Sequence, residues 1–422
     1  MKLKKYKLGD IGEIRMCKRI LKSQTTTKGD IPFYKIGTFG KEADTFISRK
    51  IFNSYKERYN FPNKGDVLIS AAGTIGRCVI YNGEDSYYQD SNIVWVNNDE
   101  SIVLNDYLFY VLNNITWIPS KGSTILRLYN DDIRNKDFIV PNLEYQRVIA
   151  DTLKAIDKKI KLNRQINDNL EAMAKQLYDY WFVQFDFPNE EGKSYKSSGG
   201  AMVWNEKLKR EIPQGWNAAK IVDVAQTYSG GTPTSTNKEY YDGGDIPWIN
   251  SGELNYPIIT STSNYITEKG LNKSSAKLYP PYTVLVALYG ATAGKVSLLS
   301  FEACSNQAVC GVIPNDNNMT IYTRYYLASL YEHFIALSSG SARDNISQDT
   351  IKNTVLPIPQ QEIIKKYSDT VAPIINKIIT NQHEIENLTK QRDELLPLLM
   401  NGQASVNYHL SVYFFRAFSY II

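Results

Sequence analysis

The sequence predicts an α+β protein with two homologous α+β domains, separated by two long helices packed as an antiparallel coiled coil with pseudo-twofold symmetry. Two observations lead to this prediction. The chain repeats itself over about half its length, and each copy ends in a long segment with heptad spacing of apolar residues.

The repeat is visible when position n is laid over position n+218. Residues 61–181 then fall on residues 279–399 without a gap, and about 26 of these 121 positions are identical. Upstream the offset becomes 215, where Gly-Asp-Ile-Pro at 29–32 meets the same four residues at 244–247. A copy of about 200 residues is too long for a solenoid repeat and therefore predicts two homologous domains.

The expected elements follow in order within each copy. Short β-type segments broken by Gly, Pro and Asn come first, for example at 66–70 and 283–287, and helical stretches such as 105–113 are interspersed. Long helices with little Gly follow Pro141 and Pro359. The predicted boundaries are domains at 1–142 and 216–358, long helices at 143–187 and 359–401, a linker at 188–215, and a tail at 402–422. Within the linker, residues 189–200 are polar and Gly/Ser-rich and are expected to be a flexible connector.

Apolar residues in both long segments step by four and three, which is the seam of a coiled coil. Each seam carries an asparagine near mid-helix, Asn163 and Asn381. One interpretation is a polar residue tolerated at a partly wet seam. The other is that antiparallel pairing brings the two amides together, so that they satisfy each other and fix the helix register.

Composition excludes few classes of protein. The formal net charge of +4 permits a nucleic-acid partner without requiring one. No apolar run reaches the ~18–20 residues of a membrane span, and no signal core follows the N-terminal lysines, so a cytoplasmic protein is expected. The four cysteines are scattered without a Cys-x-x-Cys pair, and the three histidines lack metal-ligand spacing. We therefore expect structural thiols, no metal and no cofactor.

One tetrapeptide raises the possibility of an enzyme. Tyr-Pro-Pro-Tyr at 279–282 resembles the Pro-Pro-Tyr motif of amino-methyltransferases, but that motif begins with Asp, Asn or Ser. Neither a Gly-rich S-adenosylmethionine loop nor a phosphate-binding loop accompanies it. The sequence thus favours binding surfaces over a reactive site.

Several segments together resemble type I restriction-modification specificity subunits. They are the aromatic stretch 177–187, the segment from Trp204 through Glu-Ile-Pro-Gln-Gly-Trp at 211–216, the Gly-Asp-Ile-Pro pairs, and Leu-Leu-Pro-Leu-Leu-Met-Asn-Gly at 395–402. The resemblance spans residues 1–407. It implies a non-catalytic subunit with two target-recognition domains, each reading half of an asymmetric bipartite site in double-stranded DNA. It further implies that the helices are spacer and docking site for methyltransferase and restriction/translocase subunits, which would bind methyl donor and ATP and modify adenine.

Polar or basic residues on recurring loops are the best candidates for DNA contact, because Lys and Arg bind phosphates while Arg, Gln and Asn reach base edges. They are Lys35, Arg77, Gln89, Lys121, Arg127, Lys295, Gln307, Arg343 and Asn345. The competing interpretation is that recurring Gly and Gln maintain the fold and single basic residues are solvated. Two other function classes remain open: a stand-alone methyltransferase or nuclease with duplicated domains, and a coiled-coil protein scaffold.

Overall fold

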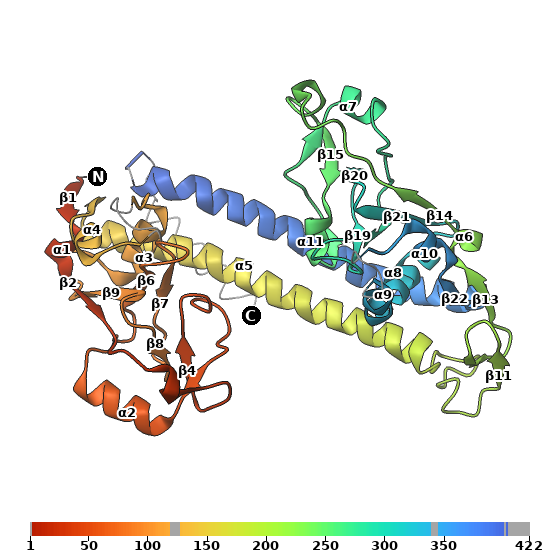
Figure 1. Ribbon diagram of the computed structural model, residues 1–422, viewed down its shortest axis with the longest axis horizontal. Coiled ribbons are helices and arrows are strands. Elements are labelled where there is room, and N and C mark those ends of the chain that lie inside the picture. The colour runs from red at the N-terminus through yellow and green to blue at the C-terminus, as the bar shows by residue number, and fades with distance from the viewer. Residues whose placement is uncertain (1, 119–126, 339–344, 401, 404–422) are drawn as a thin grey trace. The chain divides into compact units, whose positions relative to one another are not determined.

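The computed structural model describes residues 2–118, 127–338, 345–400 and 402–403 (Figure 1). The chain divides into two compact units. Unit 1 comprises residues 1–160 and 387–422, and unit 2 comprises residues 161–386. Both long helices cross this division, so each unit contains one part of each helix.

Unit 1 is built around a four-stranded sheet with strand order β2-β9-β6-β7. A second sheet, β3-β5-β4-β8, lies in a smaller lobe with helix α2, and β1 pairs with β10. The elements are β1 (Lys4–Lys7), α1 (Leu8–Ile11), β2 (Gly12–Met16), η1 (Lys22–Gln24), β3 (Thr25–Thr26), β4 (Ile31–Tyr34), β5 (Phe46–Ile47), α2 (Arg49–Arg58), β6 (Val67–Ser70), β7 (Cys78–Ile80), β8 (Tyr87–Tyr88), β9 (Ile93–Asn98), α3 (Asn105–Asn114), α4 (Asn130–Arg134), β10 (Asp137–Val140) and the start of α5 (Leu143–Tyr178).

Unit 2 repeats this plan, with a five-stranded sheet in the order β14-β21-β18-β19-β16 and a smaller sheet β17-β15-β20. The elements are η2 (Asp179–Val183), a π-helical turn, β11 (Met202–Asn205), β12 (Arg210–Pro213), β13 (Asn217–Lys220), α6 (Ile221–Val224), β14 (Ala225–Ser229), η3 (Lys238–Tyr240), β15 (Ile246–Ile249), η4 (Ser251–Asn255), β16 (Ile258–Ile259), β17 (Tyr265–Ile266), α7 (Glu268–Asn272), β18 (Val284–Ala287), β19 (Val296–Leu299), β20 (Cys304–Ser305), β21 (Val309–Pro314), α8 (Met319–Ser329), α9 (Tyr331–Ser338), α10 (Gln348–Asn353), β22 (Val355–Ile358) and α11 (Gln361–Met400).

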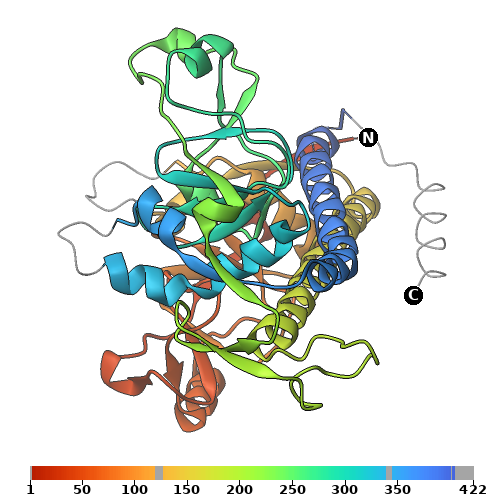
Figure 2. The ribbon, with the colours of Figure 1, turned by 90° about the vertical axis from the view of Figure 1, so that its right-hand side faces the viewer.

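Each unit has a small lobe that carries its second sheet. Figure 2 shows the unit 2 lobe, with β15 and α7, standing out from the larger sheet. The lobe of unit 1 packs on the larger sheet, because Phe33, Phe52 and Tyr87 share one buried cluster with Leu68 and Trp95 of that sheet. In unit 2 Leu285, the counterpart of Leu68, lies in a separate cluster, and the lobe cluster contains Ile266, Ala276 and Cys304. The strand order β5-β4-β8 recurs as β17-β15-β20, unit 1 adds β3, and the two lobes differ in how their buried residues cluster.

The repeat is real, but its alignment is not gapless. In unit 1 Leu68 pairs with Trp95 on β9, and in unit 2 Leu285 pairs with Gly311 on β21, which sets offsets of 217 and 216 for these strands. Strand β7 keeps the offset of 218, because Val79 and Ser297 occupy matching ladder positions. The ungapped match over residues 61–181 is therefore wrong for several strands. Strand pairing holds the framework constant, and length changes are confined to the loops.

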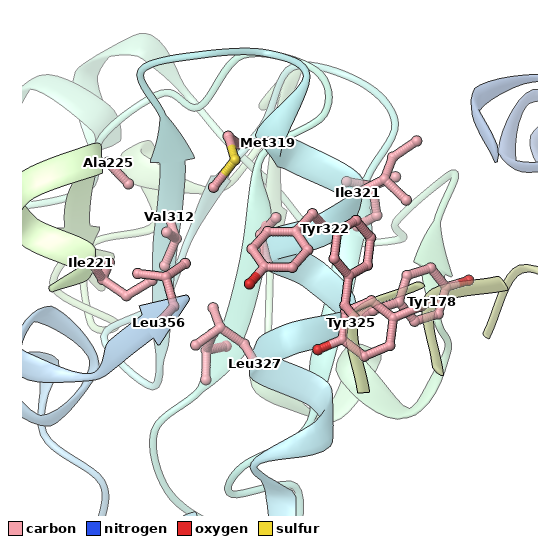
Figure 3. Close-up of a cluster of buried hydrophobic side chains, with 14 of the residues drawn as sticks. Tyr178, Ile221, Ala225, Val312, Met319, Ile321, Tyr322, Tyr325, Leu327 and Leu356 are labelled. Atoms are coloured by element: carbon pink, nitrogen blue, oxygen red, sulfur yellow. The ribbon is translucent and has the colours of Figure 1, made fainter. Parts of the chain in front are cut away.

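The main core of unit 2 joins the C-terminal half of α5 to the recognition fold. Tyr178 stacks on Tyr325 of α8 with ring centroids 5.6 Å apart, among the side chains drawn in Figure 3. Trp181 and Phe182 extend the same cluster, and Phe182 lies edge-on to Tyr322 at 4.7 Å. Aromatic pairs of this kind add about 0.5–1.5 kcal/mol each beyond the area they bury. The aromatic stretch after α5 thus anchors the helix to its unit.

The two long helices run antiparallel where they meet inside unit 2. Asn163 donates from Nδ2 to Glu384 Oε2 at 2.8 Å, and Asn381 donates from Nδ2 to Asn167 Oδ1 at 3.0 Å, so partners descend along α11 as they ascend along α5. Asn163 and Asn381 are 3% and 2% exposed. The expected amide pair between them is not formed, because the register places each opposite a different residue. Both amides are nevertheless satisfied, as buried polar groups must be.

Residues 188–215 form hydrogen-bonded turns and a hairpin, and these include the stretch 189–200 that was expected to be a flexible connector. The backbone N–H and hydroxyl of Ser197 donate to Asp186, and these two bonds hold the pKa of that carboxyl below its usual range. Strands β11 and β12 then form an antiparallel hairpin that leads to Trp216. Trp216 stacks on Phe187 with ring centroids 5.4 Å apart. The segment is therefore an ordered extension of unit 2.

Candidate nucleic-acid interface

In unit 1 the loops that carry the predicted residues are tied to one another. Gln89, directly after β8, accepts from the backbone N–H of Ile36 through Oε1 at 3.0 Å. Arg77, in the β6–β7 turn, donates from Nη1 to the carbonyl of Phe39 at 3.1 Å. The structure therefore brings Arg77 and Gln89 to one edge of the small lobe, around loop 35–41. Both side chains also brace that loop.

Two more predicted residues of unit 1 lie beside these loops. Arg127 donates from Nη2 to the carbonyl of Ser91 at 2.6 Å, which links it to the loop after β8. Lys35 forms an ion pair with Asp44 at 3.0 Å, and the pKa of Asp44 is lowered by the Thr45 hydroxyl and by this ammonium group. Asp44 neutralises part of the charge of Lys35, whose ammonium group keeps further N–H donors for a phosphate. The remaining unit 1 candidate, Lys121, lies outside the described residues.

The β6–β7 turn needs glycine at the position before Arg77. Gly76 has φ +79°, a left-handed conformation, and a Cβ there would lie 2.1 Å from Cδ1 of Trp117. Gly294 in the β18–β19 turn has the same φ of +79°. In both turns the glycine N–H donates to the last residue of the preceding strand, Ser70 or Ala287. The glycines therefore maintain the turn and present the following Arg77 or Lys295.

In unit 2 the corresponding residues have different partners. Lys295 donates through Nζ to Oδ1 of Asn255, beside the exposed Tyr256. Gln307 is exposed and its Oε1 accepts from the Thr232 hydroxyl. Asn345 forms an isolated antiparallel bridge with Tyr289, and Arg343 lies outside the described residues. Lys295 and Asn345 are thus brought to the β18–β19 turn, while Gln307 reaches toward the loop after β14.

The structural counterpart of Gln89 is Asn306, and the expected match with Gln307 is wrong. The N–H of Gln89 donates to Tyr34 at the end of β4, and the N–H of Asn306 donates to Ile249 at the end of β15. Asn306 then donates from Nδ2 to Asn250 Oδ1 at 3.0 Å, where Gln89 reaches Ile36. Sequence reasoning missed Asn306 because the ungapped offset placed it opposite Tyr88. An alignment allowing a one-residue gap between β7 and β8, where the offset changes from 218 to 217, would have found it.

Unit 1 also contains a basic segment that the motifs and the repeat did not single out. Lys18 and Arg19, which lie between β2 and η1, and Lys22, the first residue of η1, are exposed, and none has an ion-pair partner within the described part of the chain. Counting charge separately for each copy, rather than over the whole chain, would have revealed it.

The cysteine thiols are buried, and the potential metal ligands of the described residues do not form a cluster. All four cysteines are buried, and burial raises the pKa of Cys17, Cys304 and Cys310 to about 12 and that of Cys78 further. Within the described ranges, no three His, Cys, Asp or Glu side chains form a group that could hold a metal ion. Among the same residues, no helix is both long and apolar enough to cross a bilayer.

Comparisons with known proteins agree with this architecture. The family model for the type I restriction modification DNA specificity domain matches residues 2–172 and again residues 213–390. A Haemophilus influenzae protein named as a putative type I restriction enzyme specificity subunit is 50% identical over 181 residues, covering 42% of this chain and 46% of its own length. The HindI specificity subunit of the same species is 28% identical over 400 residues, covering 81% of this chain and 86% of the relative.

Two further similarities extend over nearly the whole chain. The MjaIX specificity subunit of Methanocaldococcus jannaschii is 27% identical over 424 residues, covering 95% of this chain and 93% of that protein. The crystal structure of a type I S subunit from M. genitalium superposes with a TM-score of 0.61 at 15% identity, covering 94% of this chain and 96% of the other. The two family matches coincide with the two copies of the fold, and this chain belongs to the family of type I restriction-modification DNA specificity proteins.

Proposed function

We propose that this chain is the non-catalytic specificity subunit of a type I restriction-modification complex. Its two recognition domains, residues 1–142 and 216–358, would each read one half of an asymmetric, bipartite site in double-stranded DNA. Methyltransferase subunits would dock on the long helices, methylate one adenine on each strand and bind S-adenosylmethionine. Restriction/translocase subunits would bind the same assembly. Because its proposed substrate is DNA inside the cell, we place the complex in the cytoplasm.

One observation supports this proposal above the others: the same turn occurs twice with different side chains around it. Gly76 and Gly294 share a φ of +79° and a backbone hydrogen bond to the preceding strand. Arg77 is bonded to a loop carbonyl, whereas Lys295 is bonded to an asparagine side chain. A shared framework with divergent loops is what two half-sites of different sequence require, because base edges are read by the side chains that a constant backbone presents.

The loop residues divide into two kinds of candidate contact. Arg77 has guanidinium nitrogens beyond the one bonded to Phe39, and arginine is the usual partner of guanine O6 and N7. Asn306 and Gln89 are amides at matching positions, and an amide pairs with adenine N6 and N7. Lys295 is a point charge suited to phosphate. Arg127, Gln307 and Asn345 lie on adjoining loops and would complete the two surfaces.

The test is reconstitution followed by sequencing of modified bases. The chain with its methyltransferase subunits and S-adenosylmethionine should methylate adenines in one interrupted, asymmetric motif, and the chain alone should neither methylate nor cleave DNA. A single uninterrupted motif or a perfect palindrome would contradict two differently specialised domains. Methyl transfer by a preparation free of methyltransferase subunits would support the rival assignment, a stand-alone duplicated-domain enzyme.

A further inference from the structure

The two copies of the recognition fold differ sharply in charge over one equivalent stretch. Residues 15–64 of unit 1 and 228–281 of unit 2 both run from the end of the first sheet strand to the turn before β6 or β18. The first stretch has 12 lysines and arginines against 4 acids, a net charge of +8. The second has 4 lysines against 5 acids, a net charge of −1. The chain-wide value of +4 conceals this difference.

Most of the basic residues in the first stretch are available to a ligand. Arg15, Lys35, Arg49 and Lys56 form ion pairs with carboxylates. The other eight are exposed and have no ion-pair partner among the residues that the structure describes: Lys18, Arg19, Lys22, Lys28, Lys41, Lys50, Arg58 and Lys64. An array of unneutralised cations on one domain raises the local positive potential and attracts a polyanion.

Part of this array has a fixed backbone. The hydroxyl of Tyr87 donates to the carbonyl of Lys18 at 3.0 Å, and burial raises the pKa of Tyr87, so the donor persists at any physiological pH. The Lys18 ammonium lies 5.3 Å from the ring centroid of Tyr59, which is 43% exposed at the end of α2. The segment carrying Lys18, Arg19 and Lys22 is therefore held against the C-terminal end of α2, next to Arg58.

This basic cluster adjoins the candidate interface. Tyr87, which holds Lys18, belongs to β8, and Gln89 follows directly on the same chain. Strand β8 pairs with β4, and β4 leads into loop 35–41, to which Gln89 and Arg77 are bonded. A duplex whose base edges met Arg77 and Gln89 would pass its phosphates over neighbouring side chains on this lobe.

We infer that residues 15–64 supply most of the electrostatic attraction to the DNA phosphates, with Lys18, Arg19, Lys22 and Arg58 at the centre of this basic stretch. Unit 2 then reads its half-site with mainly neutral groups. The inference rests on the proposed function and assigns unequal roles to its two domains. The exposed side chains of the unit 2 stretch fit the second role: Tyr256 is 69% exposed and Tyr265 is 41% exposed. Non-specific affinity and its salt dependence would then belong chiefly to unit 1.

The test compares two matched triple variants in the assembled methyltransferase complex. Lys18→Gln, Arg19→Gln and Lys22→Gln remove three exposed charges from unit 1, and Lys238→Gln, Lys273→Gln and Lys277→Gln remove three from the equivalent stretch of unit 2. Affinity for a duplex of about 30 base pairs of arbitrary sequence is measured from about 50 to 300 mM salt, because the slope of log K against log salt falls by about 0.9 for each phosphate that the protein ceases to neutralise. All six side chains are exposed, so thermal unfolding should be unchanged in both.

The expected result is a slope about 2–3 lower for the unit 1 variant, with affinity at 0.1 M salt about 8-fold weaker for each phosphate no longer bound, and a change below about 1 for the unit 2 variant. Equal changes in the two variants, or none in the first, would overturn the inference. Loss of assembly with the methyltransferase in the unit 1 variant alone would assign the cluster to a protein partner and would also overturn the inference. Failure of the wild-type complex to bind duplex DNA at all would count against the proposed function itself.

Discussion

The attachment of α5 to unit 2 depends on a buried ion pair, and replacing Glu171 by glutamine tests it. Arg324 of α8 donates to both carboxylate oxygens of Glu171, at 2.6 and 3.3 Å, and the Tyr325 hydroxyl donates to Oε1 at 3.2 Å. The Arg324 side chain is 4% exposed and that of Glu171 is 25% exposed. Glu171→Gln keeps the shape of the side chain and leaves the guanidinium buried without its counter-charge.

The size of the effect follows from which partner is left behind. Breaking a fully buried pair costs about 3–5 kcal/mol, and partial exposure of Glu171 reduces this to about 2–3 kcal/mol for Glu171→Gln. Arg324→Met should cost only about 1 kcal/mol, because the remaining carboxylate can reach water and still accepts from Tyr325. The double variant should resemble Arg324→Met alone, so that the coupling energy is about 2 kcal/mol.

Urea unfolding of the full chain, with hydrogen exchange followed on α8 peptides to isolate unit 2, measures these differences. In unit 1 the Tyr110 hydroxyl of α3 donates to Asp157 of α5, and Tyr110→Phe is a control that should leave exchange on α8 unchanged. If Glu171→Gln is as mild as Arg324→Met, or if the coupling is below about 0.5 kcal/mol, the carboxylate does not compensate the buried guanidinium and the reasoning fails.

Three further predictions concern other sites. Replacing both Asn163 and Asn381 by leucine should raise thermal stability and loosen helix register, because a polar seam residue exchanges stability for uniqueness; unchanged spacing between the methylated half-sites would refute this. Arg77→Gln should weaken DNA binding by about 1–3 kcal/mol if the arginine reaches a base edge. The same change removes the hydrogen bond to Phe39 and should lower the free energy of unfolding by about 1 kcal/mol. A DNA titration measures the first effect and urea unfolding measures the second. Because the pKa of Asp186 is lowered in the folded protein, its carboxylate stabilises the fold fully above the unfolded-state pKa, and this stabilisation is lost as the pH falls through the folded-state pKa. Asp186→Asn should therefore make Tm depend less on pH in the acid range. An unchanged dependence of Tm on pH would contradict this.

Local periodicity was enough to predict the long helices. The four-three spacing predicted helices at 143–187 and 359–401, and the structure has α5 at Leu143–Tyr178 and α11 at Gln361–Met400. The heptad pattern depends only on neighbours along the chain, so no tertiary information was needed. The early end of α5 was not predictable in this way, because the π-helical turn at Asp179–Val183 packs Trp181 and Phe182 into a core made by distant residues.

The candidate site was harder to predict because its residues are defined by non-local bonds. The bond between Arg77 and Phe39 joins two loops 38 residues apart, and no periodicity indicates it. The identity of Gln89 and Gln307 was a coincidence of an ungapped offset, whereas strand pairing makes Asn306 the equivalent residue. For Asn163 and Asn381 the residue type was informative, but a shift of one helical turn decided their partners.

The turn that ends at Gly76 and Gly294 also defines where the two copies are interchangeable. Six positions separate Ser70 from Gly76 and seven separate Ala287 from Gly294, yet the same backbone hydrogen bond closes both turns. A transplant of recognition loops from one copy to the other should therefore be cut at these bonded pairs, so that the strand ladders on either side keep their partners. Fusion points chosen at the offset of 218 would shift β6 by one residue. Because side chains alternate between the two faces of a strand, this shift would exchange the residues that face the core with those that face outward.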